Sequence, residues 1–358
     1  MQNRELTTIL VTGGAGFIGS NFIRYLLGRT DFTGTIVNVD ALTYAGNPQN
    51  LADLDVGERY VLEQVDIRDT AAVKDVFDRY PIDTVVHFAA ESHVDRSILG
   101  PGDFVTTNIN GTFNLLEVAR SAWEGRDDVL FHHVSTDEVY GSLGDTGAFL
   151  ETTPYDPRSP YSASKAASDH LVRAYRHTFG LPVTISNCSN NYGPYQFPEK
   201  LIPVMILNMI EGKTLPVYGE GKNVRDWLYV EDHASAIWTI LGAAEVGETY
   251  NVGGENEWQN IDLVHHLCAV VAEETGVDSS TYLDLIKFVT DRPGHDHRYA
   301  IDCTKIKQEL GWTRTHDFAS GLRETVKWYL SNTEWIDSVR SGAYRTWIEA
   351  NYGGMNRT

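Results

Sequence analysis

The first half of the chain alternates short apolar runs with longer amphipathic segments, and this alternation restricts the fold more than any other feature. The runs are rich in β-branched residues and almost continuously hydrophobic, which is typical of parallel strands buried on both faces. They cover residues 9–14, 35–40, 60–67, 84–90, 129–136 and 182–189, and helical patterns cover 17–27, 70–80, 104–123 and 162–179. Because βαβ units have right-handed crossovers, the sequence predicts an α/β fold with a doubly wound parallel sheet and ligands at the carboxyl ends of its strands.

After about residue 187 the pattern becomes irregular, because Pro and Gly separate shorter elements. We expect a first domain over residues 1–186 and a smaller α/β substrate-binding lobe over residues 187–358, with the chain crossing back around 224–252. No low-complexity linker separates them, so the lobes should pack tightly and form a cleft. Predicted helices cover 201–211, 230–241, 261–274, 304–310 and 318–329, and predicted strands cover 215–221 and 248–254.

Composition excludes several classes of partner. The formal net charge of -20 opposes binding to nucleic acid and anionic membranes, because both are polyanions. No stretch approaches the roughly 20 apolar residues of a membrane-spanning helix, and the first residues lack the regions of a secretory signal, so we expect a cytoplasmic protein with a small-molecule substrate. Cys188, Cys268 and Cys303 have no metal-site spacing, and His295 and His297 have no third ligand nearby. We therefore predict free thiols and no metal.

A glycine motif follows the first predicted strand and opens the first helix. Gly13, Gly16 and Gly19 lack a Cβ, so the turn can close and a pyrophosphate can approach the helix N–H groups, with Phe17 and Ile18 beside it. Asp40 ends the second strand 21 residues after Gly19, where its carboxylate can accept hydrogen bonds from ribose hydroxyls. A 2′-phosphate there would meet negative charge. The sequence therefore predicts a Rossmann domain that binds NAD.

Two further strand ends lie in the same register. Asp66 and Ile67 end the third predicted strand and can border the adenine. Phe88, Ala89, Ala90 and then Ser92 end the fourth, where the small alanines permit close approach of a cofactor. Because the carboxyl ends of parallel strands meet at one edge, we expect both segments to line the dinucleotide site.

Tyr161 and Lys165 form a YxxxK motif at the start of a predicted helix. Their i,i+4 spacing places the phenol and the ammonium on one face. A free tyrosine has a pKa of about 10, so it is a poor base near neutrality unless positive charge stabilises its phenolate. Lys165, together with an oxidised nicotinamide, is expected to supply that charge.

Two adjacent carboxylates, Asp137 and Glu138, follow Thr136 at the end of the fifth predicted strand. This position faces the expected nicotinamide. A hydroxyl beside two carboxyl groups suits proton transfers at two neighbouring carbons, which oxidation alone would not require.

Together these segments resemble a known family over nearly the whole chain, from about residue 8 to 330. The blocks are TGGAGFIGSNF, VDALTYAGN, HFAAESHVDRS, STDEVYG, YSASKAASDH, NNYGPYQFPEKLIP, RDWLYVEDHA and DRPGHDHRYAID. They are similar to the dTDP-glucose 4,6-dehydratases of the extended short-chain dehydrogenase/reductase superfamily. The Thr-Asp-Glu triplet and the NNYGPYQFPEKLIP block are the more specific ones, because related 4-epimerases lack the acid pair.

The resemblance implies a hydro-lyase that turns dTDP-glucose into dTDP-4-keto-6-deoxyglucose, for deoxysugars such as rhamnose. Thr136 and Tyr161 would contact the sugar O4, and Tyr161 would remove its proton as hydride leaves C4 for NAD. Glu138 would then take the C5 proton while Asp137 protonates the departing C6 hydroxyl. The hydride returns to C6, so the cofactor ends oxidised.

The resemblance also implies binding residues and a homodimer. The dimer would pair the two long helices, 104–123 and 162–179, across a twofold axis as a four-helix bundle. Further cofactor contacts would come from Leu42, Thr43, Ser92, Thr107 and Asn191. The nucleotide sugar would contact Ser92, Thr136, Asn190, Lys200, Leu201, Pro216, Tyr218, Arg225, Asn260, Arg292 and His295, with the forked donors of the two arginines suited to phosphate oxygens.

Several alternatives stay open at this point. A nucleotide-sugar 4-epimerase or decarboxylase would share the cofactor and the Tyr-Lys pair. A dehydratase acting on UDP-glucose would share all of these features and differ only in the nucleobase of its substrate. A catalytically silent dinucleotide sensor would have no use for the acid pair. The chain departs from many relatives at Ala41, where they carry Lys, and in a shorter stretch between Tyr140 and Tyr161.

Overall fold

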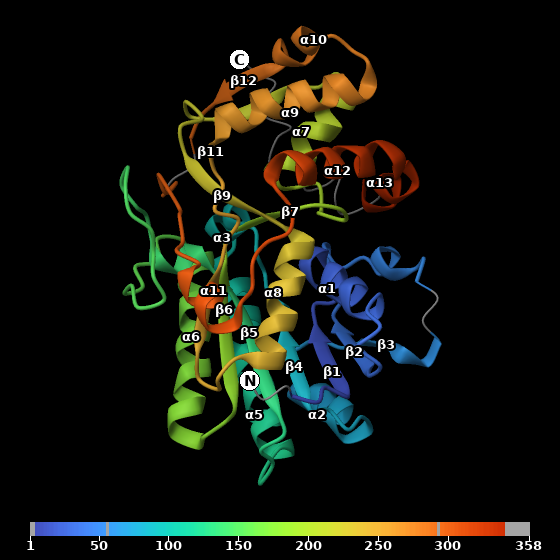
Figure 1. The fold of residues 1–358 in the computed structure, drawn as a ribbon, viewed down its shortest axis with the longest axis vertical. Helices are drawn as coiled ribbons and strands as arrows, with labels where there is room; N and C mark the ends of the chain where they lie inside the picture. The colour runs from blue at the N-terminus through green and yellow to red at the C-terminus, as the bar shows by residue number, and fades with distance from the viewer. Residues whose placement is uncertain (1–3, 55–56, 292–293, 341–358) are drawn as a thin grey trace.

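A seven-stranded sheet forms the centre of the molecule in the computed structural model, which describes residues 4–54, 57–291 and 294–340 (Figure 1). The strand order is β10-β6-β5-β4-β1-β2-β3, and all neighbouring strands are parallel. The predicted doubly wound parallel sheet is confirmed, and its order reverses between β1 and β4, where such sheets bind ligands. The strands are β1 (Thr8–Thr12), β2 (Thr35–Asp40), β3 (Tyr60–Gln64), β4 (Thr84–His87), β5 (Leu130–Thr136), β6 (Val183–Cys188) and β10 (Thr249–Val252).

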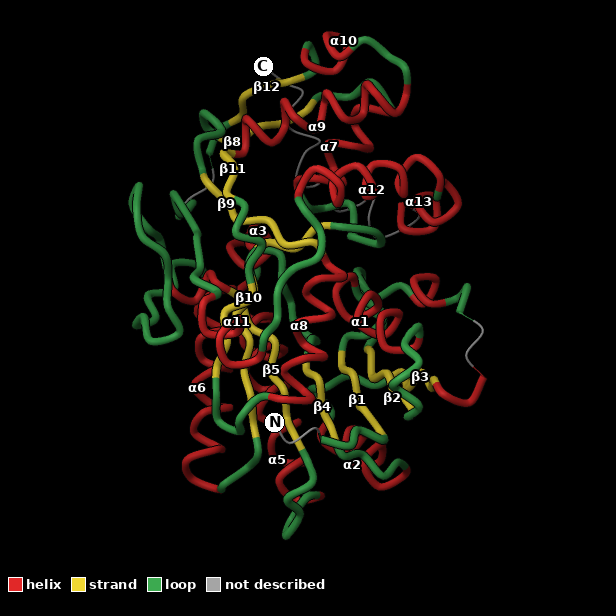
Figure 2. Tube along the Cα trace, viewed as in Figure 1, coloured by secondary structure: helices red, strands yellow, loops and turns green. Residues whose placement is uncertain are grey.

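Helices cover both faces of this sheet, because successive residues of a strand point to opposite faces. Ile9 and Val11 of β1 pack against α1 (Phe17–Leu27) and α8 (Val230–Ala243). Leu10, between them, packs on the other side against α2 (Thr70–Arg79), α5 (Thr112–Ala122) and α6 (Pro160–Phe179). All three residues are fully buried, so the apolar runs are continuous. Figure 2 shows the yellow strands between the two red helical layers.

A second lobe lies beyond the carboxyl ends of the strands, at the top of Figure 1. Its core joins apolar side chains of a helical group to two small sheets, of order β11-β9-β7 and β12-β8. The helices are α7 (Leu201–Ile210), α9 (Asn260–Thr275), α10 (Ser279–Leu283), α12 (Phe318–Ser331) and α13 (Thr333–Arg340). The strands are β7 (Asn190–Tyr192), β8 (Leu215–Tyr218), β9 (Val224–Tyr229), β11 (Glu257–Gln259) and β12 (Ile286–Val289).

The chain passes between these two regions more than once. From β9 it continues into α8, which packs on α1, and then into β10, which pairs with β6 at the edge of the large sheet. After β12 it returns to β10 through α11 (Thr304–Leu310) before ending in α12 and α13. The division into residues 1–186 and 187–358 stays a prediction.

The predicted helix over residues 104–123 is helical through residue 122, but it is not one regular α-helix. Three pieces occupy this region: α4 (Pro101–Phe104), a π-helical segment (Val105–Gly111) and α5. Asn108 explains the wider turn, since its side chain both accepts from the Glu91 N–H and donates to the Glu91 carbonyl. Its own carbonyl accepts from the hydroxyls of Thr112 and Ser168.

Two strand ends and one helix also differ from the prediction. β3 ends at Gln64 instead of residue 67, and β4 ends at His87 instead of residue 90. The Asp66 carboxylate accepts from the Arg68 N–H, which turns the chain after β3. The short helix α3 (Val94–Leu99) was not predicted, because six residues give too little periodicity.

Candidate active site

One cavity of about 780 Å³ runs along the carboxyl ends of the large sheet and under the second lobe. Its volume lies in the upper part of the range of ligand-binding pockets. Among the predicted cofactor residues, its lining includes Gly13, Gly16, Phe17, Ile18, Gly19, Asp40, Thr43, Asp66, Ile67, Phe88, Ala89, Ala90, Ser92, Thr107 and Asn191. Among the other predicted residues, it includes Thr136, Glu138, Tyr161, Lys165, Asn190, Lys200, Leu201, Pro216, Tyr218, Arg225, Asn260 and His295. Leu42 and Asp137 do not line it, and Arg292 lies outside the described residues.

The glycine motif forms a cradle that only glycine permits. Gly13 has a φ of +70°, and a Cβ there would lie 2.8 Å from the backbone of Ala89, in the segment that follows β4. A Cβ at Gly19 would lie 2.4 Å from the Gly13 carbonyl oxygen. The first turn of α1 carries no acidic residue. The free N–H groups and the positive end of the helix dipole therefore suit a diphosphate.

Asp40 joins the glycine cradle to the segment after β2. Its Oδ2 accepts from the Ala15 N–H at 2.9 Å, and its Oδ1 accepts from the Leu42 N–H at 2.8 Å. Burial raises the pKa of this carboxyl above its ordinary value, while both hydrogen bonds act in the opposite direction. Leu42 has a φ of +51°, and it contacts Asp40 through its backbone N–H and not through its side chain. Each oxygen keeps a second lone pair for a ribose hydroxyl.

Tyr161 and Lys165 lie in the first turns of α6. The helix begins with a capping box of Ser159 and Ser162, and Pro160 occupies its first turn. Lys165 Nζ donates to the Val134 carbonyl at 2.9 Å. Burial raises the pKa of Tyr161 well above its ordinary value, and nearby Glu138 raises it further. Stabilisation of the phenolate by Lys165 and an oxidised nicotinamide stays a prediction.

The acid pair divides into a buried and a more exposed carboxyl group. Thr136 ends β5 and caps the turn that follows, with its Oγ1 accepting from the Glu138 N–H at 3.3 Å. Asp137 is 2% exposed, and its Oδ1 accepts from the Thr136 hydroxyl at 3.3 Å. Burial raises the pKa of Asp137 well above its usual range, and the charges of Glu138 and Asp226 add to this. The raised pKa favours the protonated form of Asp137, as a proton donor requires, whereas Glu138 lines the cavity.

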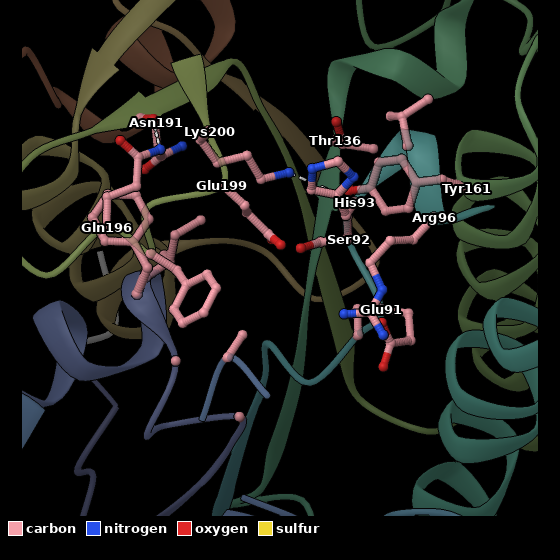
Figure 3. A pocket seen from close by; sticks show the side chains of 18 of the residues that line it. Glu91, Ser92, His93, Arg96, Thr136, Tyr161, Asn191, Gln196, Glu199 and Lys200 are labelled. Atoms are coloured by element: carbon pink, nitrogen blue, oxygen red, sulfur yellow. Dashed lines mark hydrogen bonds between the residues drawn. The ribbon is translucent and has the colours of Figure 1, made fainter. Parts of the chain in front are cut away.

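Polar groups of the second lobe converge on the same cavity. Lys200 Nζ donates to the Ser92 carbonyl at 2.9 Å across the cleft, as Figure 3 shows. The buried Oδ1 atoms of Asn190 and Asn260 accept no hydrogen bond from any residue that the structure describes. The Arg225 guanidinium stacks on the Tyr299 ring at 4.1 Å and donates to the Asp296 carbonyl. Such buried amide oxygens and a fixed guanidinium suit a polar, anionic ligand.

One further buried carboxyl group in the cavity, that of Glu199, was not predicted from the sequence. Glu199 is 6% exposed and lines the cavity, and its Oε1 accepts from the Tyr44 hydroxyl at 3.4 Å. Burial raises the pKa of Glu199 to about 7, while Lys200 and Arg96 oppose that rise. The Arg96 guanidinium lies 3.7 Å from the centre of the Tyr44 ring. Glu199 stood within the NNYGPYQFPEKLIP block, but nothing in the sequence indicated its burial.

Neither a metal site nor a membrane span is found in the parts of the chain that the structure describes. No three His, Cys, Asp or Glu side chains within residues 4–54, 57–291 and 294–340 are grouped to hold a metal ion. His295 pairs with Asp291 at 2.6 Å, and His297 lies 3.4 Å from Asp145. No described helix has the length and hydropathy to cross a membrane.

A Rossmann sheet with a glycine cradle, a Tyr-Lys pair on α6 and a second lobe over the strand ends defines the extended short-chain dehydrogenase/reductase class. The family model for GDP-mannose 4,6 dehydratase matches residues 10–325. The chain is 56% identical to dTDP-glucose 4,6-dehydratase 1 of Escherichia coli K12, over 97% of this chain and 99% of the relative. We conclude that it belongs to the family of dTDP-glucose 4,6-dehydratases.

Solved structures agree with this assignment. A dTDP-glucose 4,6-dehydratase from Streptomyces venezuelae, with NAD and TYD bound, is 45% identical at a TM-score of 0.84, over 93% of this chain and 100% of that one. A UDP-glucose 4-epimerase of Thermus thermophilus in complex with NAD reaches a TM-score of 0.80 at 29% identity, over 91% of this chain and 100% of that one. The fold is thus shared with epimerases, and the site must separate the two activities.

Proposed function

We propose that this protein is an NAD-dependent hydro-lyase that converts dTDP-glucose to dTDP-4-keto-6-deoxyglucose in deoxysugar biosynthesis. The relatives named above, which include an enzyme of this name at 56% identity over 97% of the chain, support the substrate. The acid pair beside the Tyr-Lys pair supports the chemistry, because water removal needs an acid and a base in addition to a redox group.

The cavity fits NAD along the large sheet. The cradle of Gly13, Gly16 and Gly19 would hold the diphosphate, Asp40 the adenosine ribose, and Asp66 and Ile67 the adenine. When bound, NAD supplies a hydride acceptor for C4 and a hydride donor for C6. The remaining cofactor contacts in this proposal are Phe17, Ile18, Thr43, Phe88, Ala89, Ala90, Ser92, Thr107 and Asn191, together with the Leu42 backbone through Asp40.

The chain's own residues carry the proton transfers. Tyr161 takes the O4 proton, with Thr136 beside it and Lys165 stabilising the phenolate. Glu138 removes the C5 proton once C4 is a ketone, because the carbonyl acidifies that position. Asp137, whose raised pKa favours the protonated form, gives its proton to the leaving C6 hydroxyl. Water departs, and Glu138 returns a proton to C5.

The second lobe would bind the nucleotide diphosphate. Arg225 is fixed by stacking on the Tyr299 ring and by donating to three backbone carbonyls. It lines the cavity, where its positive charge suits a phosphate. The buried Oδ1 atoms of Asn190 and Asn260 suit donor groups of the ligand. Ser92 and Thr136 would lie at the sugar. The other proposed contacts are Lys200, Leu201, Pro216, Tyr218, His295 and Arg292. Of these, Arg292 lies outside the described residues.

The single observation that carries the proposal is the contrast between Asp137 and Glu138. Neighbouring carboxyl groups with environments this different make an acid and a base at one pH. An epimerase, which only moves hydride from C4 and back, has no use for such an acid.

The test is product analysis with a panel of dTDP-glucose, UDP-glucose and GDP-mannose. We expect the 4-keto-6-deoxy product from dTDP-glucose, seen by mass as the loss of one water. A product of unchanged mass with inverted C4 would favour the epimerase. Turnover of UDP-glucose at the same kcat/KM would leave the reaction intact but contradict the preference for dTDP.

We also propose a homodimer and a cytoplasmic location. Large apolar side chains are exposed along the helical layer of α5 and α6: Val105 is 48%, Phe113 44% and Phe179 52% exposed. The outer face of α6 carries the small exposed residues Ala163 and Ala174, which would let a second helix approach. The three cysteines are buried and free, as expected in a reducing compartment. Light scattering that gave a monomer mass at micromolar concentration would contradict the dimer.

A further inference from the structure

The face of α6 that bears Tyr161 and Lys165 carries a third ionisable residue one turn further on. Asp169 follows Lys165 at i+4, so the three side chains form one row. Asp169 is fully buried, and it is not among the residues that line the cavity. Lys165, which does line the cavity, lies between Asp169 and Tyr161 along the helix.

Two hydroxyl donors and one nearby imidazole surround the Asp169 carboxylate. Its Oδ2 accepts from the hydroxyls of Ser135 and Tyr155, each at 2.8 Å, and its Oδ1 lies 3.2 Å from His133 Nε2. Burial would raise the pKa of Asp169, but His133, Lys165 and Tyr155 together hold it below the ordinary value. Burial lowers the pKa of His133 to about 4, so this imidazole carries no positive charge near pH 7, and neither its Nε2 nor Asp169 Oδ1 has a hydrogen-bond partner among the described residues. Asp169 is thus an anion that needs a nearby cation.

Lys165 is the cation on the same face. It is 5% exposed, and its Nζ bonds to the Val134 carbonyl, which accepts equally from an amine or an ammonium. Burial lowers the pKa of Lys165, and Asp169 and Cys188 oppose this. The pKa of the Cys188 thiol is raised to about 12, chiefly by burial, so the thiol is neutral near pH 7. Asp169 remains as the anion that keeps Lys165 charged.

We infer that Asp169 is a positioning residue that holds Lys165 in its ammonium form and so sustains the base function of Tyr161. The inference rests on the proposed function, because it requires that Tyr161, two turns from Asp169, acts as a base. Arg173 donates to the Tyr155 hydroxyl at 2.8 Å and continues the network towards solvent. The ionisable groups facing this pair are His87 from β4, His133 from β5, Cys188 from β6, Tyr140 and Tyr155 from the connection between β5 and α6, and Arg173 from α6 itself.

The test is the pH dependence of kcat for the 4-keto-6-deoxy product in the Asp169→Asn variant. The amide retains the size and one acceptor oxygen but removes the charge. Loss of a nearby opposite charge lowers a lysine pKa, and one such charge shifts a pKa by about one to three units. We therefore expect the alkaline limb of the kcat profile to move down by about one to three pH units. Asp169→Glu, which retains the charge, should restore the limb to the parent's position even if the rate is lower.

Ser168→Ala is the matched control. Ser168 is equally buried on α6 and donates to the Asn108 carbonyl, but it has no charge. It should lower the unfolding temperature without moving the limb. If Asp169→Asn does not fold, Asp169→Ser, which leaves room for water at the hydroxyl donors, replaces it in the same profile. A rate lowered equally at every pH would make Asp169 a structural residue only and overturn the inference. A parent protein that formed no product would instead contradict the proposed function.

Discussion

Replacing Asp137 by Asn tests whether the elimination step is separate from the redox step. Burial raises the pKa of Asp137 and so favours its neutral form, and a neutral amide of the same shape should therefore change the free energy of unfolding by less than about 1 kcal/mol. Its loss as an acid should lower product formation by roughly two to four orders of magnitude, or about 3 to 5 kcal/mol in the barrier. Tyr161 and Lys165 remain, so hydride removal from C4 should continue.

The assay is nicotinamide absorbance in parallel with product mass. In Asp137→Asn and in Glu138→Gln, reduced nicotinamide should accumulate after substrate is added, while the 4-keto-6-deoxy product falls. Exchange of the C5 proton with solvent deuterium should be most sensitive to Glu138→Gln, because Glu138 is the proposed base there. Tyr161→Phe should abolish every step and serves as the control. If both carboxamide variants formed product at the parent rate, the pair would be only a capped turn and epimerisation would become the better assignment.

Three further changes test other parts of the site. Asp40→Ala removes the acceptor of two backbone N–H groups, so NAD affinity measured by calorimetry should fall at least about tenfold, and equal parent affinity for NADP would contradict the role of Asp40. Since the pKa of Glu199 rises from 4.5 to about 7 on folding, the folded protein holds a proton that the unfolded chain releases. The free energy of unfolding of the protein without ligand should therefore fall by up to about 3 kcal/mol as pH rises through this window. Urea unfolding at about pH 5 and about pH 8 measures this decrease, and Glu199→Gln should remove it. The phenolate absorbance of Tyr161, taken as the difference from Tyr161→Phe, should be absent near neutrality without cofactor and appear when oxidised NAD binds; its presence in the ligand-free protein would contradict the effect of burial.

Much of the site could be predicted because its residues belong to continuous motifs. Gly13 to Gly19, Tyr161 with Lys165, and Thr136 with its two acids each need only local geometry to come together, and the strand register then aligns them. The π-helical turn at Asn108 could not be predicted, since it depends on hydrogen bonds to Glu91 and Ser168. The buried state of Glu199 depends in the same way on Tyr44 and Arg96, far away in sequence.

Burial affects the elimination step and the oxidation step in opposite ways. It raises the pKa of Asp137 after β5, which suits an acid, and it raises the pKa of Tyr161 on α6, which does not suit a base. The same desolvation therefore helps elimination and opposes oxidation unless positive charge is placed beside the phenol. Lys165 provides a fixed part of that charge only while it stays an ammonium, and burial works against this as well. The anion one turn further along α6 therefore offsets the effect of burial on Lys165. The more the surroundings of Asp137 exclude water and favour its acid form, the more the positive charge of Lys165 depends on Asp169.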